Sequence, residues 1–198
     1  MSESLRHRLR ALPDFPDHLP FFDLTRTPAD PVALFLQWFE HALAAGVPQP
    51  HAFSLATATV HGVISSRMLI LKDIQAAPGP AAASSGSAPS AATEADALPP
   101  QPAAWHFASM CTSRKGEELN GNPRAAMNFY WPQVGRQVRL VGAVTTLDAA
   151  ASALAWAERP GADGHENPQW QLYALHPTEI EFWQASADRH HIRHRYEL

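Results

Sequence analysis

The spacing of apolar residues first predicts one amphipathic helix. Between residues 30 and 46, apolar side chains recur every three or four positions, with Phe35 and Trp38 among them, which is typical of a helix with one buried face. Asp30 is a preferred N-cap residue, Pro31 suits the first helical position, and Gly46 ends the pattern. We expect the aromatic residues of this helix to belong to the core.

From residue 51 the period changes to two, which is typical of strands. Residues 51–60 and 63–72 are rich in Val, Ile, Leu and Thr, and the pair His61-Gly62 between them predicts a hairpin turn. The second segment carries apolar residues on both faces, and we therefore expect it to be buried on both sides. Arg67 and Lys72 fall on opposite faces of it, so each would need a bound anion or a route to water.

The rest of the chain continues mainly as strands. Six or more strands with few helices, joined mostly by short turns, predict an antiparallel β-barrel with helices packed outside it. Further strands are expected at residues 105–111, 124–131, 136–147, 169–175 and 179–184, and a short alanine-rich helix at 148–158.

Two segments lack this periodicity. Residues 1–29 form a polar, proline-punctuated arm, which favours a frayed terminus over a lid on a pocket. Residues 76–102 consist mainly of Ala, Pro, Ser and Gly, which is typical of a low-complexity loop, here inserted between strands that otherwise look like hairpin partners. We expect one domain over residues 30–198, with the arm before it and the insertion within it.

Composition narrows the class of protein. The hydrophobic fraction of 45% permits a sizeable core, and the net charge of −4 argues against a nucleic-acid-binding surface. The chain contains neither the roughly 18 consecutive apolar residues of a membrane helix nor the core of a signal peptide. These features predict a soluble, cytoplasmic protein that binds neither nucleic acid nor a membrane.

Neither the single cysteine nor the terminal histidines predict a reactive centre. Cys111 has no partner for an internal disulfide, and we expect it to be a buried strand residue rather than a nucleophile. His190, His191 and His194 are joined by no cysteine or acidic cluster, so no metal site is expected.

The residues with the clearest chemistry begin a short helix near residue 113. Thr112 or Ser113 can cap this helix, and Arg114 and Lys115 occupy its first turn, the end that the helix dipole already makes positive. Two cations at this end are explained if free N–H groups and both side chains bind one anion. Two solvated surface charges are the alternative that this stretch alone leaves open.

Taken together, these segments resemble the pyridoxamine/pyridoxine 5′-phosphate oxidases, which are flavin-dependent members of the FMN-binding split-barrel group. The matching motifs follow the family's order over residues 30–75 and 104–198. So many matches in the same order are far less probable by chance than a match to one short motif. They are Asp30-Pro31 with Leu34-Phe35 and Gln37-Trp38, Ser66-Arg67-Met68 to Leu71-Lys72, Ser113-Arg114-Lys115 with Glu118-Leu119, Asn122-Pro123-Arg124-Ala125, Phe129-Tyr130-Trp131, Arg136-Gln137-Val138-Arg139, Glu179-Ile180-Glu181-Phe182-Trp183-Gln184 and the pattern Arg189-x-His191-x-Arg193.

The resemblance implies a mainly β fold with peripheral helices, an antiparallel split barrel of six or more strands that forms a homodimer with FMN at the subunit interface. Gln137, Trp183 and Arg193 would reach the flavin from the second subunit. The implied cofactor-binding residues are Arg67, Met68, Leu69, Ile70, Lys72, Ser109, Ser113, Arg114, Lys115, Gln137, Trp183 and Arg193. The implied substrate site comprises Lys72, Arg159, Arg189 and His191, of which Arg189 and His191, two residues apart and so expected to face one way, would be catalytic.

The resemblance also implies an activity. The protein would be an FMN-dependent oxidase that moves a hydride from an amine- or alcohol-bearing carbon to flavin N5, with O₂ as electron acceptor. Its substrate would be pyridoxamine or pyridoxine 5′-phosphate, or a diverged specialised metabolite, since Ala155 and Asp163 stand where the family clamps the phosphate with a tyrosine and a serine. A flavin reductase or carrier on the same fold is the alternative.

Overall fold

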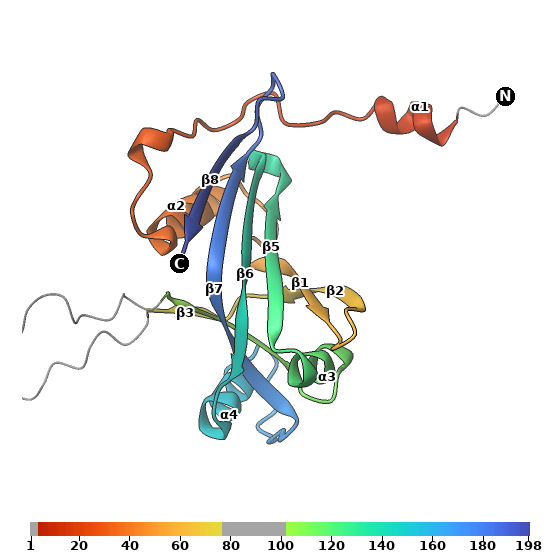
Figure 1. Cartoon of the computed structure of the whole chain (residues 1–198), viewed down its shortest axis with the longest axis vertical. Coiled ribbons are helices and arrows are strands. Elements are labelled where there is room, and N and C mark those ends of the chain that lie inside the picture. Colours follow the sequence, from red (N-terminus) through yellow and green to blue (C-terminus); the bar gives the residue numbers. More distant parts are fainter. Residues whose placement is uncertain (1–3, 77–101) are drawn as a thin grey trace, which may run out of the picture.

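The computed structural model describes residues 4–76 and 102–198, which contain one curled antiparallel sheet with helices packed against it and a first helix that projects away on an extended arm (Figure 1). The strands are β1 (Ala52–Ala58), β2 (Ile64–Ile70), β3 (Asp73–Gln75), β4 (Ala104–Met110), β5 (Arg124–Trp131), β6 (Arg136–Thr146), β7 (Trp170–Gln184) and β8 (Ile192–Glu197). The helices are α1 (Leu5–Arg10), α2 (Pro31–Ala44), α3 (Arg114–Gly121) and α4 (Ala149–Ala157), with 3-10 turns η1 (Leu24–Arg26) and η3 (Pro132–Val134).

The sheet has the order β2-β1-β5-β6-β7-β4-β3, and β8 pairs with β7 beside this path. All the strand pairs are antiparallel. This architecture confirms the predicted mainly β, antiparallel fold with few helices. In the described residues no helix is long and apolar enough to cross a membrane.

Helix α2 forms where the periodicity predicts it. The Asp30 carboxylate accepts a hydrogen bond from the N–H of Val32 at 2.9 Å, which caps the helix. The apolar face is buried, and the ring of Phe35 lies 4.6 Å from that of Trp105 and 5.1 Å from that of Phe129, measured between centroids. The aromatic residues of α2 are therefore core residues, as expected.

The predicted hairpin of β1 and β2 is confirmed, but β2 is not buried on both sides. It is an edge strand, paired with β1 alone, and its side chains alternate between half-buried and exposed. Ile64 and Met68 are 72% and 64% exposed. Arg67 and Leu69 lie on the covered face, so apolar residues on both faces of a strand do not by themselves show that both faces are covered within one chain.

Strand β7 is one continuous strand, whereas the sequence predicted two, at residues 169–175 and 179–184, on either side of Pro177. Pro177 lies opposite Gly142 of β6, where the register of the two strands shifts. A side chain at position 142 would place its Cβ 2.0 Å from the carbonyl oxygen of His176, so only glycine allows this approach. The irregularity accommodates a proline that cannot donate to the ladder, and the strand continues through it.

The predicted insertion at 76–102 falls between two paired strands. β3 and β4 are antiparallel neighbours, with Asp73 opposite His106 and Gln75 opposite Ala104. The short strand β3, which the apolar pattern did not reveal, is thus the partner of β4. Residues 77–101 lie outside the described part of the chain.

Candidate functional site

Helix α3 begins as predicted, with Ser113 as its N-cap. The backbone of Ser113 is extended and its hydroxyl accepts a hydrogen bond from the N–H of Gly116 at 3.4 Å. A side chain at position 116 would place its Cβ 2.2 Å from the carbonyl oxygen of Cys111, so glycine is required for the helix to begin this close to β4. Arg114 and Lys115 consequently lie in the first turn.

The strand and helix cations converge. Lys115 Nζ donates to Ser113 Oγ at 3.2 Å, and from β2 the Arg67 guanidinium donates to Thr57 Oγ1 at 2.6 Å and to the Leu55 carbonyl at 3.2 Å. Burial, together with the nearby positive charge of Arg67, lowers the pKa of Lys115 below its ordinary value. Cations from two separate elements thus face the same small volume.

A buried carboxylate, Glu118, organises these cations, a role that its place in the sequence does not predict. It accepts hydrogen bonds from Thr57 at 2.5 Å and Ser65 at 2.6 Å, and it pairs with Arg114 at 2.9 Å and Arg67 at 3.3 Å. The hydrogen bonds from Ser65 and Thr57 are the main reason that the pKa of Glu118 falls to about 2. Of these contacts, the sequence indicated only the ion pair of Glu118 with Arg114, through their i,i+4 spacing.

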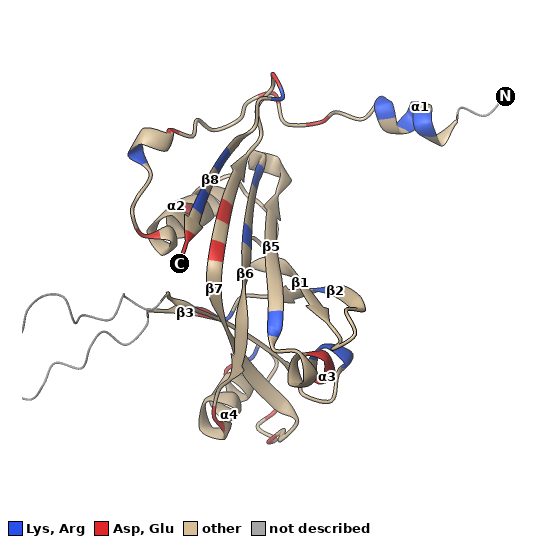
Figure 2. Cartoon of the chain, viewed as in Figure 1, with Lys and Arg blue, Asp and Glu red and all other residues tan. Residues whose placement is uncertain are grey.

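The charge of this cluster fits a phosphate monoester. Arg67, Arg114 and Lys115 contribute three positive charges and Glu118 one negative charge, which leaves a net charge of +2. A phosphate monoester such as that of FMN carries close to two negative charges at neutral pH. The hydroxyls and the free N–H groups at the start of α3 would complete its hydrogen bonds. In Figure 2, basic and acidic residues lie side by side on α3.

Residues next to the cluster include other predicted contacts. Ser109, at the end of β4, is buried, and its hydroxyl lies 3.2 Å from that of Ser113. On β2, the side chains of Met68 and Ile70 point to the open face while Leu69 packs against the core. The structure therefore groups Ser109, Ser113 and β2 around one end of α3.

The residues predicted to act from a second subunit also lie together, but elsewhere. Gln137, Trp183 and Arg193 are direct cross-strand neighbours, forming one row over β6, β7 and β8. The His191 ring packs beside the Trp183 ring at 4.8 Å, and Phe15 of the arm packs on both at 5.5 to 5.9 Å. This row lies near the β7–β8 turn, at the opposite end of the sheet from α3 and α4 (Figure 1).

Two of the predicted substrate residues share a cavity. Lys72 and Arg159 both line a hollow of about 500 Å³ between the β3–β4 hairpin and α4, and Ala155 lines it too. We call this the Lys72 cavity. The remaining lining residues are Asp73, Gln75, His106, Leu147, Ala151, Leu154, Glu158 and Leu172. One chain thus provides a cavity of substrate size between the β3–β4 hairpin and α4.

Arg189 and His191 do not line the Lys72 cavity of their own chain. Arg189 adopts a positive φ of 65° in the β7–β8 turn, outside the strand alternation, and the expectation that both residues face a substrate together stays a prediction. Arg189 forms an ion pair with Asp14, and His191 packs on the adjacent Phe15. Asp14 and Phe15 of the arm thus contact these two residues, while the Arg189 side chain stays 77% exposed.

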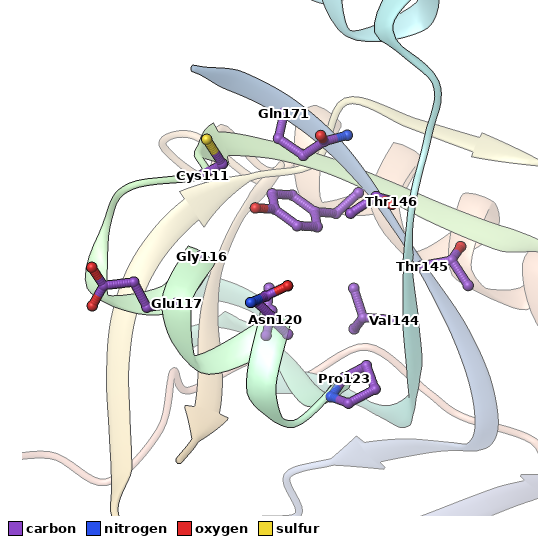
Figure 3. A pocket seen from close by; sticks show the side chains of 11 residues that line it. Cys111, Gly116, Glu117, Asn120, Pro123, Val144, Thr145, Thr146 and Gln171 are labelled. Atoms are coloured by element: carbon purple, nitrogen blue, oxygen red, sulfur yellow. The ribbon is translucent and has the colours of Figure 1, made fainter. Parts of the chain in front are cut away.

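A second cavity of about 520 Å³ lies beside α3 and is lined on one side by Cys111 (Figure 3). Cys111 is exposed and follows the end of β4, so the expectation of a buried strand residue is wrong. Tyr173 of β7 also lines this cavity, and burial raises the pKa of its hydroxyl. Among the described residues no group of three His, Cys, Asp or Glu side chains is placed to hold a metal ion.

Comparisons with known proteins show which family the chain belongs to. Residues 39–184 match the sequence model of the pyridoxamine 5′-phosphate oxidase family. A pyridoxine/pyridoxamine 5′-phosphate oxidase of Actinobacillus succinogenes is 30% identical, covering 86% of this chain and 84% of that protein, and one of Bordetella avium is 32% identical over 85% and 83%.

Solved structures show the same fold. PhzG from Burkholderia lata 383, in complex with tetrahydrophenazine-1-carboxylic acid, superposes with a TM-score of 0.72 at 26% identity, covering 91% of this chain and 93% of PhzG. An FMN-binding protein of Nostoc punctiforme has a TM-score of 0.54 at 13% identity, covering 87% of this chain and all of its own. With its split-barrel sheet and the family match over most of its length, the chain belongs to the pyridoxamine 5′-phosphate oxidase family.

Proposed function

We propose that this protein is an FMN-dependent oxidase, and that the cluster at α3 binds the FMN phosphate. The observation that carries the proposal is the net charge of +2 that Arg67, Arg114, Lys115 and Glu118 place around the start of α3. Arg67 and Lys115 lie close together, and among the described residues no carboxylate forms an ion pair with Lys115. A bound dianion would therefore relieve the repulsion between these two cations.

The remaining flavin contacts would come from a second copy of the chain. Gln137, Trp183 and Arg193 form one row, but they lie at the end of the sheet away from α3. A flavin held at α3 would meet this row if two chains pack head to end around a two-fold axis, which is the commonest symmetry of oligomers. The homodimer is therefore part of the proposal.

When bound, FMN would supply the redox chemistry by accepting a hydride at N5 and passing two electrons to O₂, which yields hydrogen peroxide. His191 would then orient the substrate. Its Nδ1 accepts the N–H of Ser186 at 3.1 Å, so a neutral His191 ring carries its proton on Nε2. In this arrangement His191 donates a hydrogen bond to the amine or alcohol, and Arg189 would close over the site beside it.

The substrate is either a B6 vitamer phosphate or a diverged metabolite. The curated relatives are named for the vitamer phosphates. PhzG, by contrast, was solved with a tricyclic carboxylic acid. The likeness to PhzG supports a small, reduced ring compound as the donor of the hydride.

An oxygen electrode tests the oxidase directly. Purified protein should be yellow, carry about one FMN per chain and consume O₂ with a reduced ring substrate, producing one peroxide for each O₂. Pyridoxamine and pyridoxine 5′-phosphates and tetrahydrophenazine-1-carboxylic acid serve as donors. A protein that holds FMN, consumes no O₂ with any of them and is reduced by NADPH would instead be a flavin reductase, and a colourless protein would contradict both readings.

A further inference from the structure

We propose that Asp163 sets the substrate class of this enzyme, so that the Lys72 cavity accepts a ring compound with one carboxylate and excludes a phosphate monoester. The inference rests on the proposed function and concerns only the anion that the substrate carries. Its starting point is the position of Arg159, one of the two cations that line the cavity.

The terminal nitrogens of Arg159 are engaged by its own loop, whereas its buried Nε has no hydrogen-bond partner among the described residues. Its Nη1 donates to the Gly161 carbonyl at 3.2 Å, and its guanidinium carbon stacks 3.6 Å from the centroid of the Trp156 ring. Its Nη2 lies 3.6 Å from an oxygen of Asp163. Asp163 is in turn held by the backbone N–H of His165 at 3.2 Å. The positive charge of Arg159 is thus matched by a carboxylate four residues later.

The other charges of the cavity do not favour a dianion. With Arg159 matched by Asp163, the remaining lining charges are one cation, Lys72, and two carboxylates, Asp73 and Glu158. Burial lowers the pKa of His106 below its ordinary value, so this ring adds no positive charge at neutral pH. A phosphate with two negative charges would face this acidic surrounding with a single unmatched cation.

A single carboxylate would meet less repulsion than a dianion in the same cavity. Lys72 has no ion-pair partner among residues 4–76 and 102–198, and one carboxylate would neutralise it. The Asp73 carboxylate is turned to its own strand, where it accepts from Ile74 N–H at 2.8 Å and from the Gln75 side chain at 3.1 Å.

The cavity wall fits a ring. Leu147, Leu154 and Leu172 line it, and Ala155 leaves open the space that a larger side chain would fill. Ligand cavities commonly combine apolar walls of this kind with a few polar groups that fix the orientation of the ligand. A planar ring against these leucines would place its carboxylate at Lys72.

Binding of two matched probes to the FMN-loaded protein tests the inference without turnover. 1-Naphthylacetate and 1-naphthyl phosphate share a ring and differ in the charge of the anion, and at pH 8 the phosphate is close to a dianion. Calorimetry should show that wild-type protein binds the carboxylate at least about tenfold more tightly. Asp163→Ser should tighten phosphate binding about fivefold or more, the upper part of the range for an exposed ion pair, and change carboxylate binding less than about twofold.

Further variants separate the contributions of Lys72 and Arg159 to probe binding. Lys72→Met should weaken carboxylate binding about tenfold or more, whereas Arg159→Gln should change it less than about threefold. Glu166→Gln, which removes a carboxylate of the same loop that forms no ion pair with Arg159, is the matched control and should leave both affinities within about twofold. FMN occupancy is measured for every variant before titration, so that lost cofactor is not read as lost affinity.

Three results would overturn the inference: wild-type preference for the phosphate, an unchanged phosphate affinity in both Asp163→Ser and Asp163→Asn, or no binding of either probe. Failure of the oxidase proposal is seen separately, as FMN-loaded protein that consumes no O₂. Because calorimetry needs no turnover, the anion preference is decided in either case.

Discussion

Arg67 of β2 and Glu118 of α3 form an ion pair, with Nη2 3.3 Å from Oε2, that ties an edge strand to the helix carrying the other cations. Glu118 is almost fully buried, and its oxygens also accept from Thr57 and Ser65. The carboxylate therefore holds Arg67 and Arg114 in place before any anion is bound. Such preorganisation lowers the cost of ordering side chains on binding.

The first prediction concerns the pH dependence of stability. The pKa of Glu118 falls from 4.5 to about 2 on folding, so its ionised form stabilises the protein above pH 4.5, and this stabilisation is lost as the pH falls toward 2. Glu118→Gln should lower the free energy of unfolding on the order of 2 kcal/mol at pH 7 and much less near pH 3. Urea unfolding at both pH values measures this difference.

The exposed neighbour Glu117 supplies the control. Glu117→Gln removes the same charge one residue earlier on α3, outside the buried network. It should change the free energy of unfolding by less than about 0.5 kcal/mol at either pH. If Glu118→Gln costs the same at pH 7 and pH 3, the low pKa is not the source of its stabilisation.

The second prediction concerns flavin affinity. Arg67→Ala combined with Lys115→Ala should remove two charge-assisted hydrogen bonds to the phosphate, each contributing about 1.5–3 kcal/mol, and weaken FMN binding roughly a hundredfold or more. Flavin fluorescence quenching measures the affinity. The paired change Arg8→Ala and Arg26→Ala alters the net charge equally at exposed positions; equal losses in both double variants would show a general charge effect instead.

The sequence predicted the local elements well because their signals are local. The cap at Asp30, the cap at Ser113 and the cations after it all occupy the expected positions. The missed features depend on contacts between distant segments. Glu118 acquires its role from Thr57 and Ser65, which lie more than fifty residues away, and no spacing on α3 reveals them.

Edges and register were equally hard to predict. Whether both faces of β2 are covered depends on its place at the edge of the sheet, which the period-two pattern does not encode. Arg136, in a motif shared with the family, is a core residue: it donates to Gln184 at 2.8 Å and stacks 4.2 Å from the Trp38 ring. A shared motif thus mixes residues of the site with residues of the core.

The third prediction is that the protein is a homodimer. Edge strand β2 exposes Ile64 and Met68, and the preceding turn exposes Val60 and Val63. Exposed apolar residues gathered in this way are typical of an interface. Sedimentation velocity should give about twice the mass of one chain at micromolar concentration, and a flavin-loaded monomer would contradict both the dimer and the shared site.

The last prediction tests whether each site takes residues from two chains. One variant combines Arg67→Ala with Lys115→Ala, and a second combines Trp183→Ala with Arg193→Ala; each homodimer should bind FMN weakly. After the two are mixed, unfolded and refolded together, mixed dimers would contain one site with both defects and one intact site. Random pairing should therefore restore about a quarter of the wild-type flavin sites, countable by absorbance after gel filtration. If both halves of a site come from the same chain, every site keeps one defect and mixing restores nothing; refolded wild-type protein shows that the procedure itself recovers flavin.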